Sequence, residues 1–249
     1  EGNSIFVGSK ETKLLVDCGI SAKRIEKSLD ELDTRASELS GILITHEHSD
    51  HIKGLGVMLR RYGLPVFATA KTIDAVLDSR YIGKVDKDLF HPIEADHPFQ
   101  LDDITVEASH VWHDAADPVC YSFYSEGFKA SIATDLGDYD EYLVEKIRDS
   151  HILFVEANHD VNMLQVGSYP YYLKRRILGD HGHLSNERCA QLIEDTVTEK
   201  TQKVYLGHLS KENNFAELAY ETVKVALTEP DFLMEVAKRD CISSITKVS

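Results

Sequence analysis

Apolar and polar positions along the first third of the chain predict alternating short strands and helices. Alternating or continuous apolar runs of a few residues are typical of strands, whereas apolar residues at three- to four-residue spacing are typical of helices. The expected elements are a hairpin of residues 3–7 and 13–16, a helix at residues 22–32, a strand at 41–44, a helix at 53–62 and a strand at 65–68. The polar segment that follows residue 44 therefore lies where a buried strand gives way to a helix.

The rest of the chain is richer in strands, and helices return after residue 138. The expected strands cover residues 99–101, 104–108, 119–124, 129–134, 152–155 and 204–206, and the expected helices cover residues 139–148 and 187–196 and begin again at Asn214. No Pro/Gly/Ser-rich linker, low-complexity tract or internal repeat divides this order. We therefore expect one domain over residues 1–249, with strands and helices in both halves.

Composition narrows the class of protein. The chain has 249 residues with 43% hydrophobic content, which is enough for one sizeable core. No apolar run approaches the roughly 18 residues that span a bilayer, and the start of the chain lacks a signal-peptide pattern. The four cysteines are scattered, as reduced thiols in a cytoplasm would be. We expect a soluble cytoplasmic protein without a membrane partner; the sequence leaves the oligomeric state open.

Net charge bears on the substrate. The 42 acidic and 27 basic residues give a formal net charge of -15, which repels polyanions at long range. A nucleic-acid substrate would therefore have to be held by a local group of cations.

Three of the 12 histidines fall within six residues, in the pattern His46-x-His48-x-Asp50-His51. Imidazole and carboxylate groups are ligands of divalent metals, and a loop of this spacing can direct alternate side chains toward two neighbouring ions. The alternative is a solvated polar loop that happens to be rich in histidine. We interpret the segment as the core of a two-metal site, with Asp50 a candidate both as a ligand and as a catalytic residue.

Four ligands cannot complete two metal shells, so further ligands must come from downstream. The candidates lie where predicted strands end: His113, Asp135 and His208. A carboxylate such as Asp135 can bridge two cations, because its charge offsets their repulsion. His110 is a rival of His113 for the third histidine.

These motifs, in this order, resemble those of metallo-β-lactamase-fold hydrolases over nearly the whole chain. The resemblance implies a four-layer αβ/βα sandwich of two mixed β-sheets flanked by helices. It also implies that a first metal is held by His46, His48 and His113. A second metal would be held by Asp50, His51 and His208, and Asp135 would bridge the two. The bridging position is not a cysteine, which departs from true β-lactamases.

Within that superfamily the chain resembles the YycJ/WalJ-type bacterial exonucleases. The similarity is carried by Gly2-Asn3-Ser4, by the turn at residues 15–19 and by residues 113–118. Residues 156–160 and 182–187 are similar to the carboxylate and His-Ser/Thr elements of tRNA 3′-processing ribonucleases, in which the matching histidine touches the scissile phosphate. The resemblance implies a 5′ to 3′ exonuclease acting on DNA.

His183 is the candidate proton donor for the leaving oxygen, a catalytic role that a metal pair does not fill by itself. The alternative is that His183 only packs beside, or helps to cap, the helix that begins near Ser185 and Asn186. Asn158, His159 and His181 are candidate phosphate contacts or supports for the ligands.

The segment from Tyr169 to Arg176 combines aromatic residues with three consecutive cations, Lys174, Arg175 and Arg176. Such a mixture lets bases stack while phosphates are neutralised. The alternative is an amphipathic helix with a solvated cationic face and buried tyrosines.

The function we expect is hydrolysis of a phosphodiester by a metal-bound hydroxide, with two divalent ions, Zn, Mn or Fe, as cofactors. A nucleic acid, DNA in particular, is the expected partner. One alternative is a small-molecule hydrolase, such as a thioesterase, lactonase or cyclic phosphodiesterase, on the same metals. A second is a binding module that keeps the fold without the chemistry.

Overall fold

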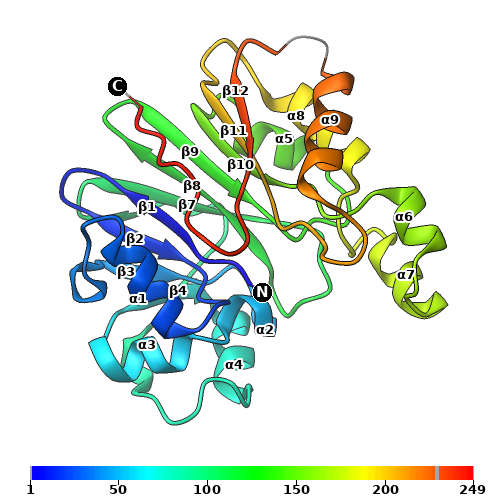
Figure 1. Ribbon diagram of the computed structural model, residues 1–249. Coiled ribbons are helices and arrows are strands. Elements are labelled where there is room, and N and C mark those ends of the chain that lie inside the picture. The colour runs from blue at the N-terminus through cyan, green and yellow to red at the C-terminus, as the bar shows by residue number, and fades with distance from the viewer. Residues whose placement is uncertain (1, 228–229, 249) are drawn as a thin grey trace. The chain divides into compact units, whose positions relative to one another are not determined.

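The computed structural model describes residues 2–227 and 230–248 (Figure 1). Its strands form two mixed β-sheets, of five and of seven strands, and helices flank them. This confirms the expected fold class. The residues group into two compact units, which we call the N-terminal unit (Glu1–Ala108 and Ala115–Val119) and the C-terminal unit (Ser109–Asp114 and Cys120–Ser249). The single-domain expectation stays a prediction.

The five-stranded sheet belongs to the N-terminal unit and has the order β1-β2-β3-β4-β5. The strands are β1 (Ile5–Gly8), β2 (Lys13–Val16), β3 (Gly41–Leu43), β4 (Val66–Thr69) and β5 (Phe90–Ile93). β1 is antiparallel to β2, as the hairpin pattern predicts, and the remaining neighbours are parallel. Parallel strands end at the same edge of a sheet. The loops that follow β2 and β3 therefore meet, and the histidine-rich segment is one of them.

Helices cover one face of this sheet. They are α1 (Ala22–Asp30), α2 (Ser49–Ile52), α3 (Leu55–Tyr62) and α4 (Ala70–Asp78). Alternate strand residues such as Leu15, Ile42 and Val66 point to that face and form a buried cluster with Ile25 of α1 and Met58 of α3. The helix expected at residues 53–62 is α3. A separate short helix, α2, precedes it and carries part of the histidine motif. α4 and β5 were not predicted.

The seven-stranded sheet includes the antiparallel hairpin of β6 (Phe99–Leu101) and β7 (Ile104–His110). Its other strands are β8 (Val119–Ser125), β9 (Phe128–Ala133), β10 (Ile152–Glu156), β11 (Lys203–Gly207) and β12 (Leu233–Val236). β8 is antiparallel to β9, whereas β9, β10, β11 and β12 run parallel as neighbours. The carboxyl ends of β9, β10 and β11 thus share an edge. β12 was not predicted.

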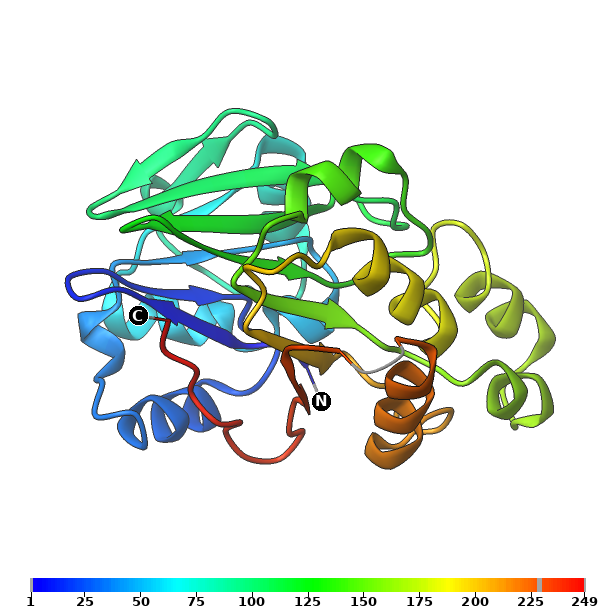
Figure 2. The same ribbon diagram turned by 90° about the horizontal axis from the view of Figure 1, so that it is seen from above.

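The helices of the C-terminal unit are α5 (Glu141–Ile147), α6 (Val161–Val166), α7 (Tyr171–Ile177), α8 (Asn186–Thr196) and α9 (Ala216–Ala226). Figure 2 shows α5, α8 and α9 on one face of the parallel strands, where Leu153, Leu206 and Ile193 share one buried cluster. The side chain of Ser185 caps α8 by accepting from the Arg188 amide at 3.2 Å. None of the helices in the described ranges is long and apolar enough to cross a membrane.

Candidate functional site

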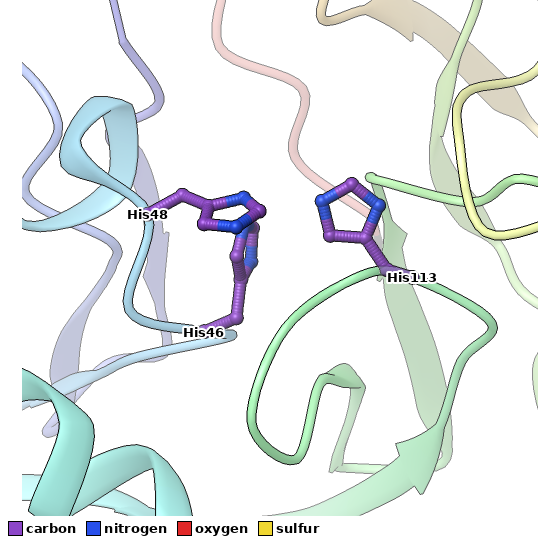
Figure 3. Close-up of side chains that lie close together, drawn as sticks. All are labelled: His46, His48 and His113. Carbon is purple, nitrogen blue, oxygen red and sulfur yellow. The ribbon is translucent and has the colours of Figure 1, made fainter. Parts of the chain in front are cut away.

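The histidine motif of the N-terminal unit forms the loop from β3 into α2. Figure 3 shows His46 and His48 on this loop, with their rings edge to face at a centroid distance of 4.6 Å. The ring of His51 lies 4.1 Å from that of His46, and both side chains are buried. Asp50 lies in the first turn of α2, with an oxygen 3.8 Å from Nε2 of His51. The loop therefore gathers four of the expected metal ligands.

Asp17, directly after β2, organises this loop. Its fully buried carboxylate accepts hydrogen bonds from the Thr45 amide at 2.9 Å and from Nδ1 of His51 at 2.7 Å. A carboxylate only accepts, so Nδ1 carries the proton and Nε2 keeps its lone pair, the state in which histidine binds a metal. Asp17 has a φ of 62°, a strained conformation that is typical of functional sites. Asp17 therefore holds both the loop and the ring of His51 in place.

A glycine makes the close approach of the Asp17 turn to α2 possible. The amides of Cys18 and Asn3 donate to the carbonyl oxygens of His51 and Asp50 at 2.7 and 2.8 Å. A Cβ atom on Gly19 would come within 1.5 Å of the Asp50 oxygen. These contacts give a structural reason for the two N-terminal segments that carry the exonuclease resemblance, since both hold the ligand loop in place.

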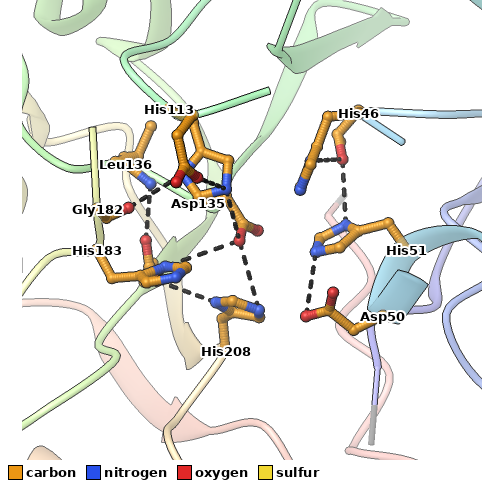
Figure 4. A network of polar contacts seen from close by, with 12 residues as sticks. His46, Asp50, His51, His113, Asp135, Leu136, Gly182, His183 and His208 are labelled. Carbon is orange, nitrogen blue, oxygen red and sulfur yellow. Dashed lines mark hydrogen bonds and ion pairs between the residues drawn. The ribbon is translucent and has the colours of Figure 1, made fainter. Parts of the chain in front are cut away.

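In the C-terminal unit, loops at the ends of strands bring together His113, Asp135 and His208 (Figure 4). Nε2 of His113 lies 3.8 Å and Nε2 of His208 lies 3.6 Å from one oxygen of Asp135. Nδ1 of His113 donates to the carbonyl oxygen of Gly182 at 3.0 Å, which leaves Nε2 facing the carboxylate. His113 is buried beside Asp135, whereas its rival His110 is exposed. Asp135 and His208 have positive φ values of 60° and 54°.

Glu156, the last residue of β10, is the organising group of this cluster and was not among the expected site residues. It is completely buried. One carboxylate oxygen accepts from Nδ1 of His183 at 2.7 Å and from Nδ1 of His208 at 2.9 Å, and the other accepts from the Leu136 amide at 2.8 Å. A glutamate at the end of the apolar run from Ile152 is a signal that could have identified it, because a buried charge needs partners.

The charges of Glu156 and His183 support each other. Burial alone would raise the pKa of Glu156, but the two imidazoles hold it well below its ordinary value. Burial alone would lower the pKa of His183, but the charge of Glu156 and the hydrogen bond to it raise that pKa. The pair therefore favours a carboxylate and an imidazolium, and the imidazolium is a proton donor. Since Ser185 caps α8, a capping role for His183 is not needed.

The donor groups fit a divalent metal. In the C-terminal unit, Nε2 of His113 and Nε2 of His208 lie 3.8 and 3.6 Å from the same oxygen of Asp135, and neither nitrogen needs a proton, because Nδ1 is the donor in each ring. In the N-terminal unit, the four residues of the histidine motif supply three imidazoles and one carboxylate. Imidazole and carboxylate donors suit Zn, Mn and Fe, and buried carboxylates that hold Nδ1 are the usual support of histidine ligands. The residues present thus support binding of divalent metal ions.

The expected phosphate contacts divide into buried and exposed groups. Asn158 is buried, and its side-chain amide donates to the carbonyl oxygen of His208 at 2.9 Å. His159 is 1% exposed, its ring makes no hydrogen bond within the described ranges, and burial lowers its pKa to about 4. Both buried positions suit residues that support the site from within. His181 is exposed, with its ring 6.5 Å from that of Trp112.

The three consecutive cations on α7 have different surroundings. Nζ of Lys174 donates to the carbonyl oxygens of Gln165 and Gly167 at the end of α6, at 2.8 and 2.6 Å. Arg176 forms two hydrogen bonds to Asp114, at 2.5 and 2.9 Å. Arg175 is exposed and makes no hydrogen bond or ion pair with the part of the chain that the structure describes.

The tyrosines of α7 do not match the amphipathic-helix alternative. Tyr171 and Tyr172 are 76% and 74% exposed, whereas that alternative needs them buried. The buried residue of α7 is Ile177. The helix therefore presents aromatic rings and one available guanidinium to solvent.

Comparison with known proteins identifies the class to which this fold and these ligand sets belong. The model of the Beta-lactamase superfamily domain matches residues 12–209, so the chain belongs to that superfamily. Exodeoxyribonuclease WalJ of Streptococcus pneumoniae is 43% identical over 230 residues, which are 92% of this chain and 86% of WalJ. Exodeoxyribonuclease YycJ of Bacillus anthracis is 42% identical over 231 residues, which are 93% of this chain and 87% of YycJ.

Solved structures show the same fold at low sequence identity. The metallo-β-lactamase fold protein YhfI of Bacillus subtilis matches with a TM-score of 0.71 and 15% identity over 98% of this chain and 92% of YhfI. Human tRNase Z, short form, matches with a TM-score of 0.67 and 16% identity over 99% of this chain and 93% of the tRNase Z chain. These likenesses support the fold, and the sequence relatives support the family.

Proposed function

We propose that this chain is a metal-dependent exodeoxyribonuclease that degrades DNA in the 5′ to 3′ direction. The observation that carries the phosphodiesterase chemistry is the buried hydrogen bond between Glu156 and His183, which prepares a proton donor beside metal-ligand candidates. The choice of DNA rests on the identity of 42 to 43%, over more than nine-tenths of the chain, to two proteins named exodeoxyribonuclease.

Two divalent ions, Zn, Mn or Fe, are the proposed cofactors. Neither unit alone offers enough ligands for two ions that must each keep an open position. The proposal is that His46, His48 and His113 hold one ion, that Asp50, His51 and His208 hold the other, and that Asp135 bridges. When bound, such a pair supplies an activated water and neutralises phosphoryl oxygens.

His183 acts on the leaving oxygen in this proposal. Glu156 fixes Nδ1 and favours the protonated ring, so the Nε2 edge is the one that can deliver a proton. The leaving oxygen of a phosphodiester is poor as an alkoxide, and general acid catalysis of this kind contributes about 10²- to 10⁴-fold to the rate.

The remaining candidates take two roles. His181 and Arg175 are exposed and are proposed to contact phosphate. Four candidates are proposed to support the site rather than to touch phosphate: Asn158, His159, Lys174 and Arg176. The first two are buried, and the two cations are engaged by backbone oxygens and by Asp114.

A cytoplasmic location is part of the proposal. The cysteines Cys18, Cys120, Cys189 and Cys241 form no disulfide, and the first three are buried. Reduced thiols of this kind are usual in reducing compartments.

The test is hydrolysis of matched substrates by protein loaded separately with Mn and with Zn. The substrates are DNA labelled at the 5′ or the 3′ end, RNA, a cyclic nucleotide and a thioester. The proposal expects early release of the 5′ label as a mononucleotide, and an affinity for DNA that decreases steeply with salt. Release of the 3′ label first would contradict the polarity. Preferential hydrolysis of the cyclic nucleotide or the thioester, with salt-independent binding, would support the small-molecule alternative instead.

A further inference from the structure

Two exposed cations lie next to the histidine motif of the N-terminal unit. Lys53 lies one helical turn after Ser49 of α2, and the Lys53 amide donates to the Ser49 carbonyl oxygen at 3.0 Å. Ser49 itself stands between two candidate ligands, His48 and Asp50. The second cation, Arg80, lies in the segment that follows α4. Neither Lys53 nor Arg80 forms an ion pair with a carboxylate in residues 2–227 and 230–248.

The lack of a carboxylate partner distinguishes these two cations from others of the same unit. Several of the others are paired with glutamates, namely Arg61 with Glu26, and Lys13 and Arg35 with Glu38. A paired cation has less charge to offer to a phosphate. Lys53 and Arg80 therefore provide local positive charge on a protein whose net charge is -15.

Tyr81 adds a hydroxyl group to these cations. Its oxygen accepts from Nη2 of Arg80 at 3.0 Å, and the guanidinium lies 5.0 Å from the centroid of its ring. This hydrogen bond and the charge of Arg80 lower the pKa of Tyr81, and the hydroxyl of Ser49 and the charge of Lys53 act in the same direction. Tyr81 is 37% exposed, and its own hydroxyl proton is donated to no residue of the described ranges. That proton is available to a ligand.

The segment that carries Tyr81 is fixed to the start of α3. Ile82, the next residue, is buried in the core of the unit. A Cβ atom on Gly56, in the first turn of α3, would lie 2.0 Å from the carbonyl oxygen of Ile82, so the two backbones approach as closely as a glycine allows. Nη1 of Arg60 donates to the same carbonyl oxygen at 2.7 Å. Because α3 begins two residues after Lys53, this packing holds Tyr81 beside α2 on rigid backbone.

We propose that Lys53, Arg80 and Tyr81 bind the terminal 5′-phosphate of a DNA strand, so that hydrolysis begins at that end. The inference rests on the proposed exonuclease function and assigns the group that recognises the 5′ end. Metal ions that clamp phosphoryl oxygens act on any phosphodiester, so the polarity of an exonuclease needs a separate group. A terminal phosphate monoester carries about -1.5 to -2 charges at pH 7, whereas an internal phosphodiester carries about -1. Two cations and a hydroxyl donor match the terminal phosphate better.

The test compares two DNA substrates of one sequence, one with a 5′-phosphate and one with a 5′-hydroxyl. For the metal-loaded wild type, KM is expected to be about tenfold lower with the 5′-phosphate, as charge-assisted hydrogen bonds to it would give. Three variants, Lys53→Gln, Arg80→Gln and Tyr81→Phe, are expected to raise that KM toward the value for the 5′-hydroxyl strand. They should leave kcat, and both constants for the 5′-hydroxyl strand, nearly unchanged.

Conservative variants and a distant one are the controls. Lys53→Arg and Arg80→Lys keep the charge and are expected to retain most of the preference for the 5′-phosphate. Lys87→Gln removes another exposed cation that has no ion pair within the described part of the chain. Lys87 precedes β5 and therefore lies at the opposite edge of the parallel strands from the ligand loop. Its loss is expected to change neither KM.

Binding without turnover gives a second readout. Strands with a 3′ fluorophore and cleavage-resistant end linkages are titrated with each protein, and the fluorescence anisotropy is followed. The wild type is expected to bind the 5′-phosphorylated strand more tightly and with a steeper dependence on salt, and Lys53→Gln and Arg80→Gln should reduce both differences.

The outcomes separate this inference from the function on which it rests. Hydrolysis of DNA with equal KM for the two 5′ ends would overturn the inference and leave the exonuclease proposal standing. An equal rise of KM for both ends in the variants would do the same, because it would indicate contact with internal phosphates. Absence of DNA hydrolysis by both the Mn-loaded and the Zn-loaded protein would overturn both.

Discussion

The ligand candidates of the two units are arranged in opposite ways. In the N-terminal unit, His46, His48, Asp50 and His51 lie within six residues of one loop. In the C-terminal unit, His113, Asp135 and His208 come from three loops that are far apart in the sequence. A contiguous loop is recognisable as a motif, whereas dispersed ligands are recognisable only when a sheet brings the ends of its strands together.

The two arrangements share one device, a buried carboxylate that is not itself an expected ligand. Asp17 accepts from Nδ1 of His51, and Glu156 accepts from Nδ1 of both His183 and His208. Asp17 also binds the Thr45 amide and therefore holds a loop as well as a ring. Glu156 holds two rings with different proposed roles. On the proposed roles, Glu156 would couple metal binding to proton donation, whereas Asp17 would serve metal binding alone.

The largest expected effect tests whether the two units serve the same metal ions. Asp50→Ala and Asp135→Ala each remove one ligand from a different unit, and each is expected to abolish metal-dependent hydrolysis and to lower the metal content. The double variant should be no worse than the more damaged single variant, because ligands of one centre act as a unit. Metal analysis and rates with single-stranded DNA make the comparison. Independent metal loss in the two variants, with half the activity kept, would contradict a shared centre.

The next effect separates Glu156 from His183. His183→Ala is expected to lower kcat about 10²- to 10⁴-fold with metal retained, because only the proton donor is lost. Glu156→Gln is expected to cause a similar fall in kcat and, in addition, about 10- to 100-fold weaker metal binding through His208. Equilibrium dialysis against Zn, alongside rates, distinguishes the two. Loss of metal from His183→Ala would identify His183 as a ligand instead.

A smaller effect is expected at the corresponding carboxylate of the N-terminal unit. Asp17→Asn keeps an acceptor but removes the charge that fixes the His51 ring, so metal affinity is expected to fall about 10- to 100-fold. Excess metal should restore kcat, because His183 and Glu156 are untouched. A kcat that stays low at saturating metal would show that Asp17 does more than orient a ligand.

The smallest effect concerns the start of α8. Ser185→Ala removes the side-chain cap from the Arg188 amide, and the free energy of unfolding is expected to fall by about 1 kcal/mol. Activity should be nearly unchanged, because the cap touches neither Glu156 nor the ring of His183. Urea unfolding followed by circular dichroism measures the first quantity. A large loss of kcat would imply that the cap positions His183.

Much of the fold was predictable because its signals are local. Apolar periodicity identified the hairpin, the buried strands and helices such as α5 and α8, with ends displaced by a few residues. α4, α6, β5 and β12 were missed. β5 and β12 are edge strands with one parallel neighbour and little buried surface, so their residues carry only a weak apolar pattern.

What the sequence by itself determined is the set of groups available for chemistry: the histidine motif, its position between a strand and a helix, and the later ligand candidates at strand ends. Those features depend on neighbours in the chain. Only the tertiary structure decided that Glu156 holds two imidazoles, that His113 and not His110 lies beside Asp135, and that Arg176 and Lys174 are engaged while Arg175 is available. These are pairings between residues far apart in the sequence, and no local spacing encodes which distant partner a charged group meets once the strands are aligned.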